Sequence, residues 1–387
     1  MVELELRKND VDLQELDHSM EKMDLEFEAL LSASTTLESI YGGIDSGEVS
    51  LESASTALDV SFPAISSMVS FEGKEVSLEG IGEALKKIWE SIKRTLRRAW
   101  DAFSAFFSKL FGGVGKLKSK VKELKPKFDS RYEYVQTKES KQLATMLSID
   151  GKYDFGTLEE GIEHAKNIKS TLDVLPEHLE SVYREVTDIV NKRSMFDGTL
   201  MDMLSKHTSV VKSGKMYQVL TGSPLPGNYY IVSIQFEDYF TAKLLSDMGL
   251  SDSTQLPEFG ILQHTKTKNA KRLKEYNGNG EFTDKIYGSF CLKYLEGVEY
   301  LLTAVEEKKK FIESLDSVRD KATSSIQKLV EDSDRGKLSK LLTKAEISGL
   351  NMLLGSRVKT SVNRSFSYVY RYARNSVSFL EGLERAK

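Results

Sequence analysis

The stretch "KKIWESIKRTLRRAWDAFSAFFSKLF", residues 86–111, decides the fold class of this chain. Its apolar residues recur at steps of three and four, the spacing that places side chains on one face of an α-helix. Trp89 and Trp100 are eleven residues apart, so they lie about 20° from the same line along a helix. The pattern predicts a helix over residues 81–111 with an aromatic, apolar face opposite a basic face.

Three uses fit such a helix. Its apolar face packs on protein while its basic face binds a polyanion such as DNA, in a contact that is sequence-independent and salt-sensitive. Alternatively, the helix lies in a membrane interface, or it is a core helix whose basic face is solvated. The residues that we predict to contact a polyanion or a membrane are Lys86, Lys87, Lys93, Arg94, Arg97, Arg98, Trp89, Trp100, Phe103 and Phe107.

The next stretch, "GGVGKLKSKVKELK" at residues 112–125, is rich in glycine and lysine. The glycines predict a hinge, followed by a lysine-rich turn or short helix. Pro126 ends the segment, because proline cannot continue a helix interior. We therefore expect residues 80–125 to form a basic helix and a hinge that precede the main body of the protein.

Residues 127–387 are expected to form that body, which is mainly helical. Near 214–236, "MYQVL" and "YYIVSIQFE" flank the turn-rich "TGSPLPGN", a pattern that predicts an inserted β-hairpin. The capping-box sequence "TLEE", which begins at Thr157, predicts the start of a long helix. Residues 351–374 alternate arginines with aromatic residues, which indicates either a nucleic-acid contact or an exposed arginine face above an aromatic core face. The predicted fold class is mainly α.

Motifs for catalysis or cofactor binding are missing from the sequence. The five histidines are scattered, no CxxC or HExxH occurs, and no phosphate-binding GxxxxGK[ST] is present. Cys291 is the single cysteine, so no internal disulfide forms. We expect no enzyme activity, no metal and no cofactor. No uncharged apolar window is long enough to predict a membrane-spanning helix, and the N-terminus does not resemble a secretory signal.

The net charge of −4 hides a strong asymmetry. Residues 1–79 contain 18 Asp+Glu and four Lys+Arg, a net charge of −14. The remaining residues contain 40 acids and 50 bases, a net charge of +10. Residues 86–125 alone contain twelve Lys+Arg and three acids, a net charge of +9. The sign changes at about Glu79, which indicates an acidic segment attached to a basic protein.

The tripeptide Ser-x-Glu marks the same boundary. It occurs five times in residues 1–79 and nowhere after residue 79. The last copy, Ser77-Leu78-Glu79, stands directly before Gly80 and the basic helix. The other four copies end at Glu21, Glu48, Glu52 and Glu72. A protease that cuts after glutamate in such triplets would remove the acidic segment and stop at Gly80.

This acidic segment with repeated Ser-x-Glu triplets resembles the propeptides of internal head proteins of large tailed bacteriophages. The junction "SLEGIGEALKKIWESIKRTLRRAWDAF" is similar to the start of mature internal head proteins of phiKZ-like giant phages. The resemblance covers about residues 1–115. It implies a prohead protease that cuts after Glu79, at a cleavage site formed by Ser77, Leu78, Glu79 and Gly80. Further candidate sites end at Glu21, Glu48, Glu52 and Glu72. It also implies capsid or scaffold proteins and packaged DNA as partners.

The sequence therefore predicts a non-enzymatic virion protein. It is made in the host cytoplasm as a precursor, cut after Glu79 and enclosed in the capsid with DNA. A membrane-surface protein that acts through helix 81–111 is the first alternative. A soluble helical scaffold with a permanent acidic tail is the second.

Overall fold

The computed structural model describes residues 78–174, 216–220, 224–236, 259–264, 272–315 and 362–386, with isolated positions between them such as Glu15. In order, the elements are α3 (Leu78–Leu124), the 3-10 turn η1 (Lys125–Lys127), β1 (Glu133–Gln136), α4 (Lys141–Leu147), α5 (Phe155–Lys166), β2 (Met216–Leu220), β3 (Tyr229–Phe236), β4 (Phe259–His264), β5 (Ile286–Tyr287), α9 (Gly288–Glu307) and β6 (Leu383–Arg385). Residues 362–381 are also helical. The described part is mainly α, as predicted.

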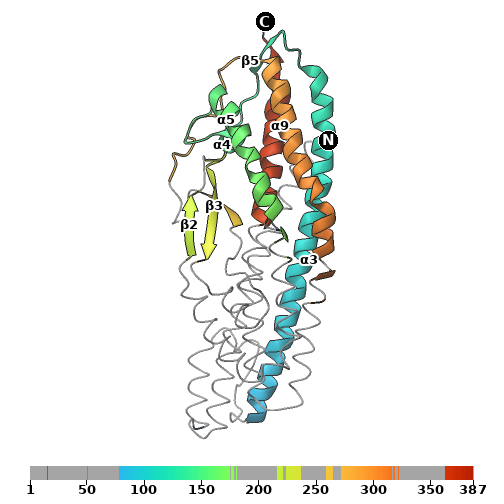
Figure 1. Ribbon diagram of the computed structural model, residues 1–387. Helices are drawn as coiled ribbons and strands as arrows, with labels where there is room; N and C mark the ends of the chain where they lie inside the picture. Colours follow the sequence, from blue (N-terminus) through green and yellow to red (C-terminus); the bar gives the residue numbers. More distant parts are fainter. Residues whose placement is uncertain are drawn as a thin grey trace.

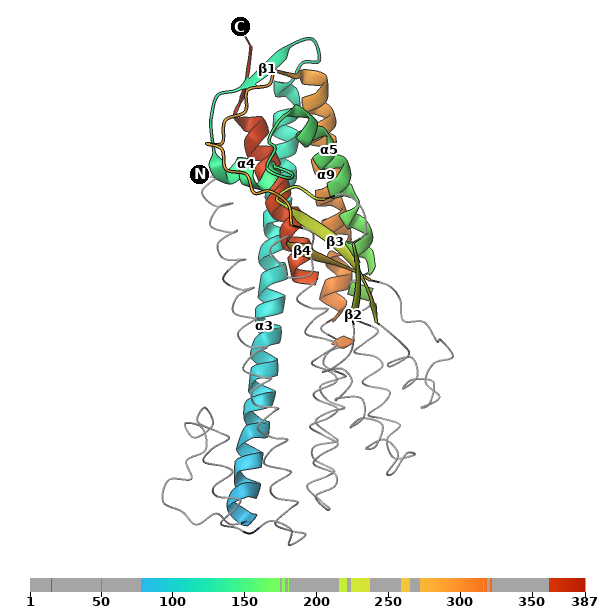
Figure 2. The same cartoon turned by 90° about the vertical axis from the view of Figure 1, so that its left-hand side faces the viewer.

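Helix α3 is the longest described element, and its 47 residues span about 70 Å. It runs along α9, and its N-terminal part extends beyond the other described elements (Figures 1 and 2). The predicted helix over residues 81–111 is confirmed, but the predicted hinge at residues 112–125 is wrong. The helix continues through Gly112, Gly113 and Gly115 to Leu124 and ends two residues before Pro126.

The glycines remain helical because the apolar face of α3 does not stop at Phe111. Val114, Leu117 and Val121 are fully buried and continue the stripe at helical spacing. Each helical glycine costs about 1 kcal/mol relative to alanine. Burial of one such aliphatic side chain contributes more, about 1.5–3 kcal/mol. Packing of the apolar face therefore outweighs the conformational freedom of the glycines.

The helix at residues 362–381 lies at the centre of the bundle. Phe366, Tyr368, Tyr370 and Tyr372 are all at most 1% exposed, although steps of two residues point them in different directions around a helix. Phe366 packs edge-on against Phe107 of α3, with ring centroids 5.2 Å apart. Aromatic residues are therefore buried on two sides of the helix instead of the single aromatic face that the sequence suggested, while Arg364 is exposed and Arg371 is half-buried on the predicted arginine face.

Buried hydrogen bonds fix the position of this central helix. The hydroxyl of Tyr294 in α9 lies 3.0 Å from the hydroxyl of Tyr372 and 3.1 Å from Oγ of Ser376. Tyr368 donates a hydrogen bond to the carbonyl oxygen of Pro226 at 3.1 Å. Because burial makes unpaired hydroxyls costly, these contacts select one arrangement of the helices rather than merely adding apolar area.

Two antiparallel sheets complete the described structure. Strands β2 and β3 form the predicted hairpin, in the register Met216↔Phe236 to Leu220↔Val232. The hairpin prediction is confirmed, and β4 adds a third strand beside β3 that the sequence analysis did not anticipate. The second sheet, in the order β5-β1-β6, was not predicted. It joins the chain after α3, the start of α9 and the C-terminus at one end of the bundle (Figure 1).

A polar turn attaches β3 to the body. Gly227 and Asn228 have left-handed backbones, and Asn228 accepts a hydrogen bond from the backbone N–H of Asp150 at 3.0 Å. The Asn228 amide donates to the carbonyl of Lys274 at 2.8 Å, and the N–H of Lys274 donates to the Asp150 carboxylate at 2.7 Å. Asparagine and glycine tolerate this backbone conformation, so the turn depends on these residue types.

The capping-box prediction is wrong in detail. Helix α5 begins at Phe155, and its cap is Asp154, whose carboxylate accepts from both the N–H and the hydroxyl of Thr157 at 2.8 Å. Thr157 therefore lies inside the first turn instead of starting the helix. Aspartate is as good an N-cap as serine or threonine, so Asp154 can cap the helix three residues earlier than the sequence analysis expected.

The contact between α5 and α9 allows a matched test with two helical glycines. A Cβ at Gly297 would lie 2.5 Å from Cγ1 of Ile162, whereas a Cβ at Gly115 would meet no atom within 4 Å among the residues that the structure describes. We expect Gly297→Ala to lower the free energy of unfolding by about 1–3 kcal/mol. Gly115→Ala should raise it by about 1 kcal/mol. Urea unfolding followed by circular dichroism measures both; a Gly115→Ala variant less stable than the original chain would contradict the continuous helix.

Candidate functional site: the outward face of helix α3

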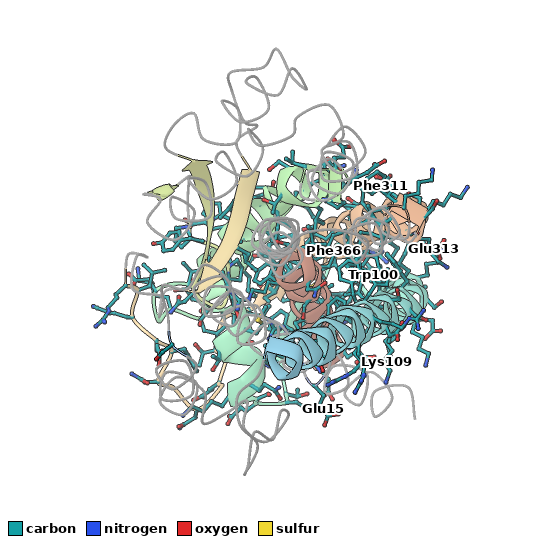
Figure 3. All side chains as sticks on the ribbon, turned by 90° about the horizontal axis from the view of Figure 1, so that it is seen from below. Glu15, Trp100, Lys109, Phe311, Glu313 and Phe366 are labelled. Carbon is teal, nitrogen blue, oxygen red and sulfur yellow. The ribbon has the colours of Figure 1, made fainter. Side chains whose placement is uncertain are left out.

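The inner face of α3 is part of the protein core. Trp100, Phe103 and Phe107 are 5%, 1% and 3% exposed, and Phe106 and Leu110 are fully buried. Trp100 stacks on Phe103 with ring centroids 4.7 Å apart, and Phe103 lies 4.8 Å from Phe107. Figure 3, which looks along the bundle, shows Trp100 and Phe366 on the inner side of α3. The three predicted contact rings therefore stabilise the fold in this structure.

Lysines at the edge of α3 hold the helix to its neighbours. Lys118 pairs with Glu306, and Lys120 pairs with Glu381. Lys125, just after the helix, pairs with Glu299 of α9 at 2.7 Å. Its ammonium group lowers the pKa of the Glu299 carboxyl below the usual value. These half-exposed pairs individually contribute little to stability, but they fix which side of α3 faces the body.

At the end of α3 the chain also caps the central helix. The Lys127 ammonium donates to the carbonyl oxygens of Leu380 and Glu381, at 3.1 and 2.8 Å. A cation is favourable at these positions because the last carbonyls of a helix carry partial negative charge. Partial burial lowers the pKa of the Lys127 side chain. This lysine is therefore structural and belongs to the inward side.

The outward face of α3 is basic and exposed. We define it by the exposed residues between 94 and 123, which are Arg94, Arg97, Arg98, Asp101, Ser108, Lys109, Gly112, Gly115, Lys116, Ser119, Lys122 and Glu123. Six of them are cationic and two are acidic. From Arg94 to Lys122 the face extends for about 42 Å along the helix. Figure 3 shows Lys109 on the outer side of α3, away from Phe366.

Sequence analysis found only part of this face. Arg94, Arg97 and Arg98 are exposed. Exposure is required of residues that contact a polyanion, so these three remain candidates. The backbone positions of Lys86, Lys87, Trp89 and Lys93 lie in α3, but their side chains are outside the described part of the structure. The backbones of the predicted cleavage residues Leu78, Glu79 and Gly80 are helical and lie at the edge of the described part of α3. Ser77, Glu21, Glu48, Glu52 and Glu72 lie outside the described residues.

Lys109, Lys116 and Lys122 were missed as members of one surface, because the predicted hinge separated the last two from the helix. The signal that could have found them is the apolar series Leu110, Val114, Leu117, Val121 and Leu124, which continues the helical spacing without a break. An uninterrupted stripe on one side implies an uninterrupted face on the other.

The described residues show no metal site, no membrane-spanning helix and no reactive thiol. Within the described residues, no group of three or more His, Cys, Asp or Glu side chains could hold a metal ion. No described helix is long and apolar enough to cross a membrane. Cys291 is buried, and burial raises the pKa of its thiol to about 12, so it is not a reactive nucleophile.

Comparison with known proteins agrees with the resemblance seen at the N-terminus. The family model of the phiKZ-like phage internal head proteins matches residues 4–258, which is more than half of the chain.

The chain belongs to the phiKZ-like phage internal head proteins.

Membership places this internal head protein inside the virion capsid as a structural component. The match reaches well past residue 115, where the resemblance seen in the sequence ended, and includes α3, α4, α5, β2 and β3. No curated protein and no solved structure matches the chain significantly. Family membership thus gives the location of the protein. A candidate contact surface comes from the structure, in which the outward face of α3 is a basic, exposed surface.

The position of Trp100 gives a test of the membrane alternative. In a Trp89→Phe variant all tryptophan fluorescence comes from Trp100, which is 5% exposed. We expect blue-shifted emission that resists quenching by iodide and does not change when anionic vesicles are added, because the ring already has an apolar environment. The matched Trp100→Phe variant reports on Trp89. Loss of quenching protection or a vesicle-induced shift at Trp100 would show that α3 leaves the core.

Proposed function

We propose that this internal head protein is a non-enzymatic precursor that a prohead protease cuts after Glu79 and that is packaged in the capsid with DNA. The observation that supports the proposal is a coincidence of two boundaries in the sequence. The last Ser-x-Glu triplet ends at Glu79, and the sign of the charge changes at the same position. Each boundary has a different physical origin, so their coincidence favours a processing site.

Removal of the acidic segment changes the electrostatics of the whole protein. The net charge goes from −4 to +10, because the segment contributes −14. A negatively charged precursor is repelled by nucleic acid and remains soluble during assembly with capsid or scaffold proteins. The positively charged product is attracted to packaged DNA. Cleavage would therefore control when the protein associates with DNA.

The outward face of α3 fits non-specific contact with duplex DNA. It presents Arg94, Arg97, Arg98, Lys109, Lys116 and Lys122 over about 42 Å, the rise of roughly twelve base pairs. Phosphate contacts of this kind need no base recognition and release counterions. The membrane alternative requires Trp100, Phe103 and Phe107 to leave the core, at a cost of several kcal/mol. DNA needs no such rearrangement.

Cleavage is tested directly on protein recovered from virions. N-terminal peptide mass spectrometry should find a semi-tryptic peptide that starts at Gly80, and peptides from residues 1–79 should be missing. The same protein from infected cells, before heads mature, is the control and should retain Met1. An intact Met1 end at full stoichiometry in virions would exclude a cut after Glu79, and the acidic tail would then be permanent.

The DNA contact is tested by removing charge from the outward face. We expect Arg94→Gln, Arg97→Gln and Arg98→Gln together, in a chain that starts at Gly80, to weaken duplex binding. The slope of log K against log salt should fall in magnitude by up to about 3, since each lost phosphate contact removes about 0.9. Fluorescence anisotropy at several salt concentrations measures the slope.

The matched control removes the same charge elsewhere. Lys141, Lys152 and Lys274 are exposed and lie outside α3, so their replacement by Gln should change the slope much less. Equal effects of the two triple variants would mean that binding follows net charge alone, and the outward face would have no special role. The full-length chain, which retains residues 1–79, should bind duplex DNA more weakly than the unsubstituted chain that starts at Gly80.

A further inference from the structure

The outward face of α3 has room to receive another helix. Where a Cβ would lie at Gly112 and at Gly115, no atom of the described residues comes within 4 Å. Together with Ser108 and Ser119, these glycines form a line of small residues along the middle of the face. Arg94, Arg97 and Lys122 lie near its two ends, and Lys109 and Lys116 lie beside it. The face thus combines room for close approach with positive charge along its length.

The acidic segment of the same chain has complementary properties. Residues 1–79 have a net charge of −14, against +9 for residues 86–125. Within residues 3–31, apolar residues at helical spacing alternate with acids, a pattern that indicates a helix in need of a partner surface. As a helix these 29 residues would extend for about 44 Å, close to the 42 Å of the outward face.

Covalent connection favours this partner over any free one. The acidic segment precedes α3 in the same chain. Residues 32–77 are long enough to let residues 3–31 return along the helix, so docking occurs at the high effective concentration of a tether. In addition, Figure 3 shows Glu15 on the same outer side of α3 as Lys109, away from Phe366.

We propose that residues 3–31 dock along the outward face of α3 in the precursor and cover the surface that later contacts DNA. The acidic segment is then an intramolecular inhibitor that occupies a defined site, rather than a distant counter-charge. The inhibition of DNA binding by this segment rests on the proposed function. The docking itself requires neither cleavage nor DNA. Cleavage after Glu79 would cut the tether, lower the effective concentration and let phosphate groups replace the acidic side chains.

Cross-linking in the full-length chain tests the docking. The test variants combine Glu15→Cys with Ser108→Cys or with Ser119→Cys on the outward face, since the native Cys291 is buried and unreactive. Glu15→Cys with Ser170→Cys is the matched control, because Ser170 is an exposed serine outside α3. At low salt we expect a bismaleimide to join the two introduced thiols about tenfold faster in at least one outward-face variant than in the control.

Salt and charge reversal then test the electrostatic cause. Raising the salt to about 1 M should bring the outward-face rate toward the control rate, because the Debye length falls to about 3 Å. Arg94→Glu, Arg97→Glu and Lys122→Glu together should have the same effect at low salt. The salt titration needs no change to the outward face, so it is informative even where the triple variant folds poorly.

Two results would overturn the proposal. One is a cross-linking rate at Ser108 and Ser119 no faster than at Ser170. The other is a fast rate that neither salt nor charge reversal changes. Neither result affects the cleavage hypothesis, which depends on the N-terminus found in virions. Conversely, fast, salt-sensitive cross-linking together with an uncleaved protein in virions would support the docking proposal and contradict only the proposed release by cleavage.

Discussion

Burial of the apolar stripe of α3 is the constraint on which the rest of the structure depends. From Trp100 to Val121 the stripe lies against α9 and the helix at residues 362–381. Its burial keeps the glycines at 112, 113 and 115 helical, orients the basic side chains outward and turns Lys118 and Lys125 toward acids on α9. The composition of the outward face is thus a consequence of core packing, because it is the side of α3 that the core does not use.

The central helix explains why this packing is specific. Apolar contact alone would permit several rotations of α9 and of the helix at residues 362–381 about their axes. The hydrogen bonds of Tyr294 with Tyr372 and Ser376, and of Tyr368 with Pro226, favour one arrangement of these two helices. The sheet β5-β1-β6 then ties the ends of these segments together. The rotation of α3 against them is fixed by its buried stripe and by the ion pairs of Lys118, Lys120 and Lys125, and this rotation gives the outward face its composition.

For an internal head protein, such a division of one helix has a functional logic. The rings that suggested membrane contact from the sequence are needed to hold α3 in the fold, so they are not free to act elsewhere without unfolding. Charged side chains on the outward face carry only a small desolvation penalty, because their charged ends remain in water. In the proposed sequence of events, this face contacts first the acidic segment of its own chain and then, after the cut following Glu79, phosphate groups of DNA.

By itself, the sequence determined the elements whose signals are local: the helix over residues 81–111, the hairpin at 216–236, the mainly α class and the boundary at Glu79. Helical periodicity, strand alternation, net charge and short motifs depend only on residues close in the chain. Tertiary structure alone decided that Asp154 caps α5, that β4 joins the hairpin, and that aromatic residues are buried on two sides of the helix at residues 362–381. These outcomes depend on partners distant in the sequence, whose contribution to the free energy no local pattern contains.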